Sequence, residues 1–276
     1  MRAAVVGHVE WVEFARVERV PGRGEIEHAS DWWEEPAGGG AVAAVQLAKL
    51  AGGCTFYTAL GDDSVGRRAE EALERLGVRM EVAWRDTPTR RAVTFVDPGG
   101  ERTITTLGPR LNPYADDPLP WDELDQADAV YFTAGDVEAL RRARQARVLV
   151  PTTRIMALLG EAGVHLDAVV GSARDPSERY EPALLRDPPG LVVLTEGAAG
   201  GRFRASDGRS GRYEPAVLPG PLVDTYGGGD SFAAGLTFAL GAGWAPEDAL
   251  ALAARCGAWC VAGRGPYGNQ LTSGEL

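Results

Sequence analysis

The chain has 276 residues, a formal net charge of −11, 45% hydrophobic residues and 24% charged residues. This length fits one large α/β domain, and the composition is ordinary for a globular protein. The acidic balance argues against nucleic acid or an anionic membrane surface as the main partner. The only lysine, Lys49, lies inside an apolar helical pattern, which excludes a P-loop lysine and other lysine-dependent chemistry.

Cysteines and apolar runs restrict the class of protein further. Cys54, Cys256 and Cys260 form no Cys-x-x-Cys pair and no even framework, so we expect buried free thiols. The sequence has no apolar run of about 18 residues and no secretory h-region. We therefore expect a cytoplasmic protein.

The first part of the chain predicts a buried strand and then strands with one solvated face. Residues 3–7 are apolar and end in glycine, without the spacing of a dinucleotide-binding G-x-G-x-x-G loop. Residues 9–20 and 25–33 alternate between apolar and polar side chains around a Pro-Gly-Arg-Gly turn. Three glycines at 38–40 then precede a predicted helix over 41–50, and such glycines let a ligand approach the backbone closely.

The next part predicts a strand, a capped helix and a hairpin. Residues 55–60 form the strand, and Asp63 or Ser64 is a natural N-cap for a helix that continues to residue 76. Residues 91–96 and 102–107, joined by Asp-Pro-Gly-Gly, predict the hairpin. Several arginines gather here, which fits either a solvated strand face or contact with an anionic substrate group: Arg90, Arg91, Arg102 and Arg110.

Strands and helices alternate in the second half. The pattern predicts strands at 129–133, 147–150, 168–171 and 191–194, helices at 137–145 and near 155–159, and two more helices within 231–262. This alternation predicts a parallel sheet with helices on both faces, whose ligands bind at the carboxyl ends of the strands. The final residues, 267–276, are polar, and we expect them to be loosely held.

The strongest chemical signal lies at residues 223–236. Gly227, Gly228 and Gly229 precede an apolar helix over 232–240, and free N–H groups at a helix N-terminus form an anion site. Asp230 falls in the first turn, where the positive field favours a charged carboxylate. An anion cradle beside a carboxylate suits phosphoryl transfer, in which the carboxylate takes the proton of the acceptor hydroxyl.

This segment, Asp224-Thr225-x-Gly227-x-Gly229-Asp230, resembles the C-terminal signature D-T-x-G-A-G-D of the ribokinase-like (PfkB-type) sugar and nucleoside kinases, with Gly228 in place of alanine. Other family motifs occur in the family's order: P-x-x-G-E from Pro21, the start of G-G-x-x-x-N at Gly38-Gly39-Gly40, G-D-D-x-x-G from Gly61 and T-x-G-x-x-G from Thr195. The resemblance spans nearly the whole chain. It implies one α/β domain over 1–276, with a doubly wound, mostly parallel central sheet, helices on both faces and a small β-sheet lid. The lid strands would be excursions at about 9–35 and 88–108.

The resemblance also implies roles for single residues. Asp230 would be the catalytic base, and Gly227, Gly228 and Gly229 the anion hole. The implied ATP contacts are Thr195, Gly197, Gly200, Thr225 and Gly265, and the implied acceptor contacts are Glu10, Gly38, Gly39, Gly40 and Arg110. Ser172 and Asp175 stand where the family has the N-x-x-E pair that organises magnesium, although an N-cap role explains Asp175 equally well. Asp224 would lie near a site for a monovalent cation such as K⁺.

The chain departs from the family at the acceptor end. Val42 falls where the family has an asparagine, and Glu10 and Glu13 flank the expected position of an acceptor-binding aspartate. We expect an ATP-dependent, magnesium-requiring kinase that phosphorylates a hydroxyl of a sugar or sugar-like small molecule. A nucleoside kinase and a non-catalytic, metabolite-binding member of the same fold are the alternatives. The exposed sheet edge of the lid offers a surface for a homodimer.

Overall fold

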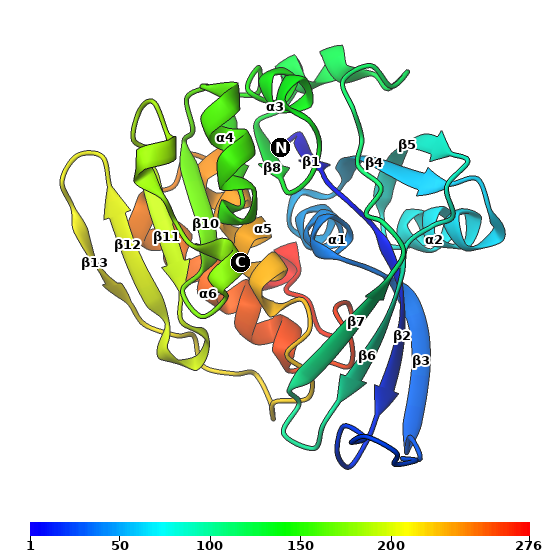
Figure 1. Ribbon diagram of the computed structural model, residues 1–276. Coiled ribbons are helices and arrows are strands. Elements are labelled where there is room, and N and C mark those ends of the chain that lie inside the picture. Colours follow the sequence, from blue (N-terminus) through cyan, green and yellow to red (C-terminus); the bar gives the residue numbers. More distant parts are fainter.

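A five-stranded parallel sheet lies at the centre of the computed structural model, which describes residues 1–276 (Figure 1). Its strand order is β5-β4-β1-β8-β9, with the bounds Ala3–Val6 (β1), Cys54–Gly61 (β4), Val78–Arg85 (β5), Ala129–Phe132 (β8) and Val148–Pro151 (β9). A parallel bridge from Thr152 to Val170 connects β9 with a second sheet of order β10-β11-β12-β13. Those strands are Ala168–Ser172, Leu191–Thr195, Gly201–Ala205 and Ser210–Tyr213. The mostly parallel sheet predicted from the sequence is confirmed, whereas β5, β12 and β13 were not predicted.

Helices cover both faces of the central sheet. One face packs against α1 (Gly39–Ala51), α2 (Ser64–Arg75), α5 (Gly228–Gly241) and α6 (Pro246–Val261), and the other against α3 (Val137–Ala143) and α4 (Met156–Ala162). Along β1 the side chains alternate between the two layers: Val5 belongs to the first core and Val6 to the second. Both faces of these strands are therefore buried, which explains their continuous apolar runs.

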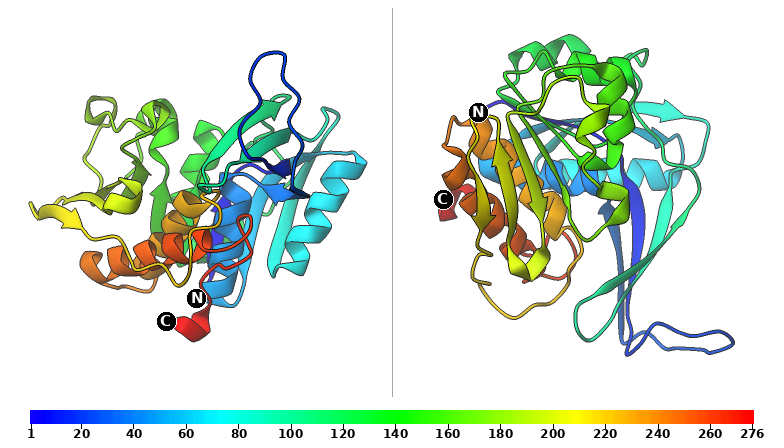
Figure 2. Two further views of the ribbon diagram at one scale, coloured as in Figure 1. Left: turned by 90° about the horizontal axis from the view of Figure 1, so that it is seen from below. Right: turned by 60° about the vertical axis from the view of Figure 1, so that its left-hand side comes forward.

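A separate four-stranded sheet, the lid, extends from one end of the central sheet (Figures 1 and 2). Its order is β3-β2-β6-β7, with the bounds Glu10–Arg16 (β2), Asp31–Ala37 (β3), Arg91–Val96 (β6) and Arg102–Leu107 (β7). The strand predicted at 25–33 was placed too early, because its pairing with β2 begins at Asp31 and continues to Ala37. Pro36 is tolerated there because β3 is an edge strand.

The C-terminal segment is anchored, so the expectation that residues 267–276 are loosely held was wrong. The Tyr267 hydroxyl donates to the Pro36 carbonyl at 2.7 Å, and the Gln46 side chain donates to the Leu271 carbonyl at 2.7 Å. Leu271 is fully buried, and the Gln270 amide donates to the Val42 carbonyl at 3.1 Å. The polar side chains of this segment thus satisfy buried backbone groups. None of the helices combines the length and the apolar composition that a membrane span needs.

The two helices that begin at glycines begin earlier than predicted, α1 at Gly39 and α5 at Gly228. The residues before them, Gly38 (φ 89°) and Gly227 (φ 79°), adopt left-handed backbone conformations that glycine takes without strain. The N-termini of these helices lie against each other, since α1 and α5 pack together and Gly39 contacts Asp230. The fold thereby joins two glycine motifs from opposite ends of the chain.

Candidate active site

Asp230 lies in the first turn of α5 and faces the N-terminus of α1. A methyl group on Gly39 would lie 2.9 Å from Asp230 Oδ1 and 3.8 Å from His8 Cε1, so both side chains meet the bare backbone of Gly39. On Gly38 the same methyl group would lie 3.2 Å from His8 Cδ2 and 3.4 Å from Glu10 Cγ. Glycine is required for this close approach. Four residues predicted from the sequence as site residues, Glu10, Gly38, Gly39 and Asp230, are therefore neighbours in space.

Gly40, which the sequence also placed at the acceptor site, has a packing role in the structure. A methyl group on Gly40 would lie 2.8 Å from the backbone nitrogen and oxygen of His8 and 2.8 Å from the Phe56 ring. Contacts this short with backbone atoms cannot relax easily. Gly40 therefore holds the loop after β1, and with it His8, against α1.

An open backbone notch precedes α5. The first helical hydrogen bond runs from the Ser231 N–H to the Gly227 carbonyl at 2.8 Å, so the preceding N–H groups have no acceptor in the helix. No hydrogen bond joins the N–H groups of Gly228 or Gly229 to another part of the protein. A methyl group on Gly229 would meet no atom within 4 Å, and Gly229 is exposed. The notch can therefore receive an anionic oxygen directly.

The electrostatic environment raises the pKa of Asp230 to about 6. Burial is the largest cause, and the Glu178 carboxylate adds to it, while the Arg102 and Arg154 guanidinium groups act in the opposite direction. The group remains half-buried and is ionised in most molecules at pH 7. A carboxylate with a pKa just below neutral pH is suited to accept a proton during turnover.

The acceptor end of the site is lined by charged groups from the lid. Arg90 precedes β6 and Arg110 follows β7; Arg90 Nη1 lies 3.3 Å from Glu10 Oε1. His8 Nε2 lies 3.8 Å from the same oxygen. Burial, followed by the nearby Arg110 and Arg90 charges, holds the pKa of His8 well below its ordinary value, so His8 is neutral at pH 7. The asparagine of the family's G-G-x-x-x-N signature, counted from Gly38, falls at Ala43 rather than at Val42 as expected above; both residues are fully buried and line no surface.

The Ser172 and Asp175 segment leads into the short 3₁₀ helix η3 (Pro176–Glu178), and Asp175 is its N-cap. Asp175 Oδ1 accepts the Ser177 N–H at 2.9 Å, and Oδ2 accepts a bond from Arg154 at 2.7 Å. Arg154 also binds Glu178, whose other oxygen accepts the Ser172 N–H at 2.6 Å. Every oxygen of both carboxylates already has a partner. These residues therefore fit Mg²⁺ only as outer ligands that bind its water molecules.

The nucleotide-site residues predicted from the T-x-G-x-x-G motif follow β11. Thr195 ends this strand beside Ser172 of β10, and the Ala173 N–H donates to the Thr195 carbonyl at 2.9 Å. Gly197 (φ 65°) and Gly200 (φ 74°) have left-handed backbones, so side chains there would be strained. The structure thus places Thr195, Gly197 and Gly200 beside the Ser172 segment at the carboxyl ends of two parallel strands.

Thr225 and Asp224 connect the lid to the base of the notch. The Thr225 hydroxyl donates to Glu101 at 2.6 Å and accepts a bond from Arg102 at 3.1 Å. Asp224 is fully buried and accepts the N–H groups of Tyr226 at 2.8 Å and Gly265 at 3.2 Å.

A second carboxylate, Glu35, lies against Gly265. Burial, opposed by a hydrogen bond from Trp33, raises the pKa of Glu35 to about 7, and the Asp224 charge adds to the shift. Asp224 is buried and Glu35 is half-buried, and two neighbouring carboxylates with uncommitted lone pairs fit a monovalent cation. Gly265 itself is buried under Glu35 and packs against it more closely than any residue with a β-carbon could.

Sequence reasoning assigned no role to His8, Arg154 or Glu178. Each lies just beyond a strand of the central or second sheet: His8 after β1, Arg154 in the 3₁₀ helix η2 (Thr153–Ile155) after β9, and Glu178 after β10. The general rule that ligands bind at the carboxyl ends of parallel strands was the signal that pointed to these positions.

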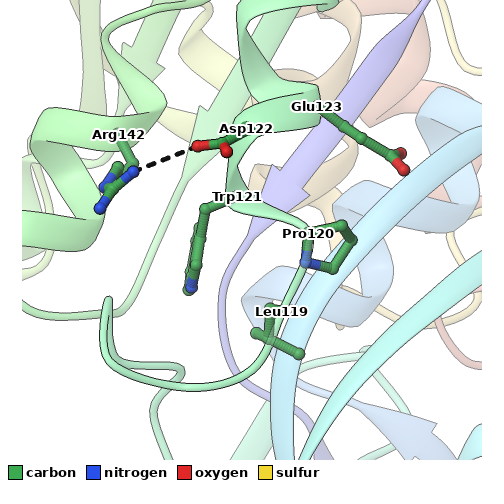
Figure 3. A pocket seen from close by; sticks show the side chains of 6 residues that line it. All are labelled: Leu119, Pro120, Trp121, Asp122, Glu123 and Arg142. Atoms are coloured by element: carbon green, nitrogen blue, oxygen red, sulfur yellow. Dashed lines mark hydrogen bonds and ion pairs between the residues drawn. The ribbon is translucent and has the colours of Figure 1, made fainter.

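A separate surface depression lies around the 3₁₀ helix η1 (Trp121–Gln126), on the face of the sheet opposite α5 (Figure 3). It has a volume of about 420 Å³, and Arg142 lies 3.2 Å from Asp122 across it. None of the residues discussed above lines it. We therefore assign it no part in the chemistry at Asp230.

Comparison with known proteins identifies the family. The model of the pfkB family of carbohydrate kinases matches residues 2–157 and 138–272. The chain is 30% identical to the ATP-dependent ribose-1-phosphate kinase of Halopiger xanaduensis, over 96% of this chain and 93% of the relative. It is 28% identical to a fructokinase of Salmonella typhimurium, over 86% of this chain and 90% of the relative. The crystal structure of ribokinase from Thermotoga maritima shares the fold with a TM-score of 0.79 at 20% identity, over 99% of this chain and 97% of that one. This chain therefore belongs to the pfkB family of carbohydrate kinases, which transfer a phosphoryl group from ATP to a hydroxyl of a sugar or sugar-like molecule.

Proposed function

We propose that this chain is a catalytically active sugar kinase in which Asp230 is the general base. Asp230 takes the proton of the acceptor hydroxyl while that oxygen attacks the γ-phosphorus of ATP, and the bond from the γ-phosphorus to the bridging oxygen of ADP breaks. The N–H groups of Gly227, Gly228 and Gly229 hold the charge on the transferred group. ADP and the phosphorylated acceptor leave, and Asp230 returns its proton to water.

One observation carries this proposal: an ionisable carboxylate faces a close-packed glycine backbone and adjoins free helix N–H groups. The carboxylate is that of Asp230, and the N–H groups of Gly228 and Gly229 have no partner within the protein. A regulatory member without catalysis would have no need of this pairing. The non-catalytic alternative is therefore disfavoured.

ATP binds, in this proposal, along the carboxyl ends of β10 and β11. Thr195, Gly197, Gly200, Thr225 and Gly265 are the proposed nucleotide contacts. Magnesium would enter with the phosphates of ATP, whose charge it neutralises, and Ser172 and Asp175 would hold its waters. Arg154 bridges Asp175 and Glu178 and so keeps this segment in place beside Asp230.

A monovalent cation is the proposed occupant of the space between Asp224 and Glu35. It would relieve the repulsion between these two carboxylates and would stiffen the segment that leads into the notch. The test is the rate of ADP release in KCl against the rate in LiCl at equal ionic strength. We expect activation by K⁺ in the wild type and none in Asp224→Asn. Equal rates in both salts would contradict a cation site.

The acceptor is proposed to be a sugar rather than a nucleoside. Supporting this choice, the relatives cited above are named as kinases of fructose and of ribose 1-phosphate. The acceptor end of the site is also charged, since Glu10 lies 3.3 Å from Arg90. An ADP-release assay across sugars, sugar phosphates, sugar acids and nucleosides tests the assignment. Turnover with nucleosides alone would reverse it, and no turnover in the whole panel would favour the non-catalytic alternative.

A homodimer through the lid is the proposed assembly. β3 and β7 form the two edges of the lid sheet, and both carry exposed apolar side chains: Trp32 (70% exposed), Ile104 and Leu107. An edge strand with apolar side chains is a favourable surface for pairing with a second copy. Sedimentation velocity of the wild type and of Trp32→Glu tests this, with a monomeric wild type as the contradicting result.

A further inference from the structure

Two arginines meet at the acceptor end of the site with too few acidic partners. Arg90 comes from the loop before β6 and Arg110 from the loop after β7, and the pKa of Arg110 is lowered by burial and then by the Arg90 charge. The Trp11 N–H donates to the Arg90 carbonyl at 2.9 Å, which fixes that loop against β2. The backbone of the lid thus holds one of the two guanidinium groups in position.

The charges in this pocket do not balance. Glu10, 3.3 Å from Arg90, is the only carboxylate within 4.0 Å of either guanidinium, and none lies that close to Arg110. Burial raises the pKa of Glu10, so its charge is the more costly one to keep. His8 is neutral and adds no compensation. Glu10 therefore balances only one of the two guanidinium charges, in a chain whose net charge is −11.

Hydrogen-bond donors in the pocket also lack partners. The Nε atoms of Arg90 and Arg110 are buried without an acceptor. The Arg90 side chain is only 13% exposed. Arg154 provides the contrast, because the same site gives it two carboxylates, Asp175 and Glu178. Leaving buried guanidinium donors unpaired is costly unless an anion completes them.

A series of contacts connects this arginine pair with the catalytic carboxylate. Gly39 contacts both Asp230 and His8, and Gly38 contacts both His8 and Glu10, which in turn adjoins Arg90. A small molecule with a hydroxyl at Asp230 would therefore extend across Gly38 and Gly39 toward the two arginines.

We infer that the acceptor carries, besides the hydroxyl that receives the phosphoryl group, an anionic group that Arg90 and Arg110 bind. A phosphate ester and a carboxylate share the required chemistry, since both offer anionic oxygens to guanidinium N–H groups. This inference rests on the proposed kinase function and specifies its substrate class as a sugar phosphate or a sugar acid.

The first test compares acceptors that differ in the anionic group: ribose, ribose 1-phosphate, ribose 5-phosphate and ribonate. We expect kcat/KM with ATP to be ~100-fold higher for an anionic acceptor than for ribose, since hydrogen bonds to charged groups are among the strongest. The ribose phosphates and ribonate separate the two sources of negative charge. A preference ratio near one for all three anionic compounds would overturn the inference while leaving the kinase function intact.

The second test removes the arginines. Arg110→Gln and Arg90→Gln should each lower the preference for the anionic acceptor by ~10-fold or more, mainly through KM, because the lost bonds exist in the ground state. Arg75→Gln is the matched control, since Arg75 is 70% exposed and lies far along α2. It should leave the preference unchanged. An unchanged preference in both pocket variants would overturn the inference.

A binding measurement keeps the two proposals separate. Calorimetric titration of ribose 5-phosphate and of ribonate into Asp230→Asn without ATP reports on the pocket alone. Binding of either compound that exceeds the binding of ribose and is lost in Asp230→Asn/Arg110→Gln supports the inference even if no acceptor is phosphorylated. Binding of both compounds no stronger than that of ribose, or binding indifferent to Arg110, contradicts it.

Discussion

Replacing Asp230 with asparagine should slow catalysis strongly and stabilise the fold at the same time. Raising the pKa of this carboxyl from its ordinary 3.8 to about 6 opposes folding by ~3 kcal/mol once the group is ionised, since one pKa unit is worth about 1.36 kcal/mol. The side chain keeps some contact with solvent, so we expect about half of this, ~1.5 kcal/mol. For a chain of this size that is a Tm increase of ~3–6 °C.

The sign of the effect depends on pH. A carboxyl whose pKa is raised by folding favours the folded state in its protonated form, so its destabilising effect is absent below pH 4 and grows as the pH rises toward 6. The stability gain of Asp230→Asn should therefore be full at pH 8 and should shrink toward pH 4. The control is Asp122→Asn, whose side chain is 94% exposed and which should change Tm by less than ~1 °C.

Two assays test the predicted effects of Asp230→Asn on stability and on activity. Thermal unfolding of both variants across this pH range measures stability, and ADP release with the best acceptor measures kcat, which should fall by ~100-fold or more in Asp230→Asn. A variant that turns over like the wild type would refute the general-base role. A variant that loses activity without gaining stability at pH 8 would refute the argument that burial raises the pKa of Asp230.

Three further outcomes follow from the site geometry. Glu178→Gln should move the acidic limb of the kcat/KM profile to lower pH, because the Glu178 charge raises the pKa of Asp230. Arg102→Gln should move the same limb to higher pH, because the Arg102 charge lowers that pKa. Movement of the limb in the same direction in both variants would contradict this assignment. Gly229→Ala should keep the Tm of the wild type but lose ~10-fold or more in kcat, because the added methyl group meets no protein atom yet enters the notch. Gly53→Ala is the control: its methyl group also meets no protein atom, and the variant should retain full activity. Gly40→Ala should cost ~2 kcal/mol and lower Tm by ~4–8 °C in a melting experiment, because its methyl group would lie 2.8 Å from the His8 backbone; an unchanged Tm would show that this loop can move aside.

The parts of the fold that follow a regular period were predictable, and the parts that depend on distant partners were not. The apolar run of β1 and the strand–helix alternation after residue 129 indicated the parallel sheet, because burial on both faces leaves a visible pattern. The strand β12 and the edge strand β13 were missed because exposed arginines interrupt their apolar residues. The polar C-terminal segment misled for a similar reason, since local sequence cannot reveal that the Gln270 amide donates to the Val42 carbonyl or that the Leu271 carbonyl accepts a bond from Gln46.

The candidate site, too, was predictable where its residues are adjacent in the chain and unpredictable where they are distant. Asp230 and the glycines before it formed a recognisable pattern, because they are adjacent in the chain. The contact between Asp230 and Gly39 depends on how α1 and α5 pack, and the sequence around either residue does not predict that packing. Asp175 illustrates the limit: the sequence left open a metal or a capping role, and only the position of Arg154 shows that both of its oxygens are engaged.

The bond from Tyr267 to Pro36 has a consequence for biosynthesis. It ties an edge strand to a segment made 231 residues later in translation, and Gln46 and Leu271 form a second such tie, over 225 residues. While the ribosome still encloses residues 267–271, neither tie can form, so β3 and α1 lack these two contacts. The nascent protein should therefore acquire a protease-resistant β3 only after residues 267–271 have left the ribosome.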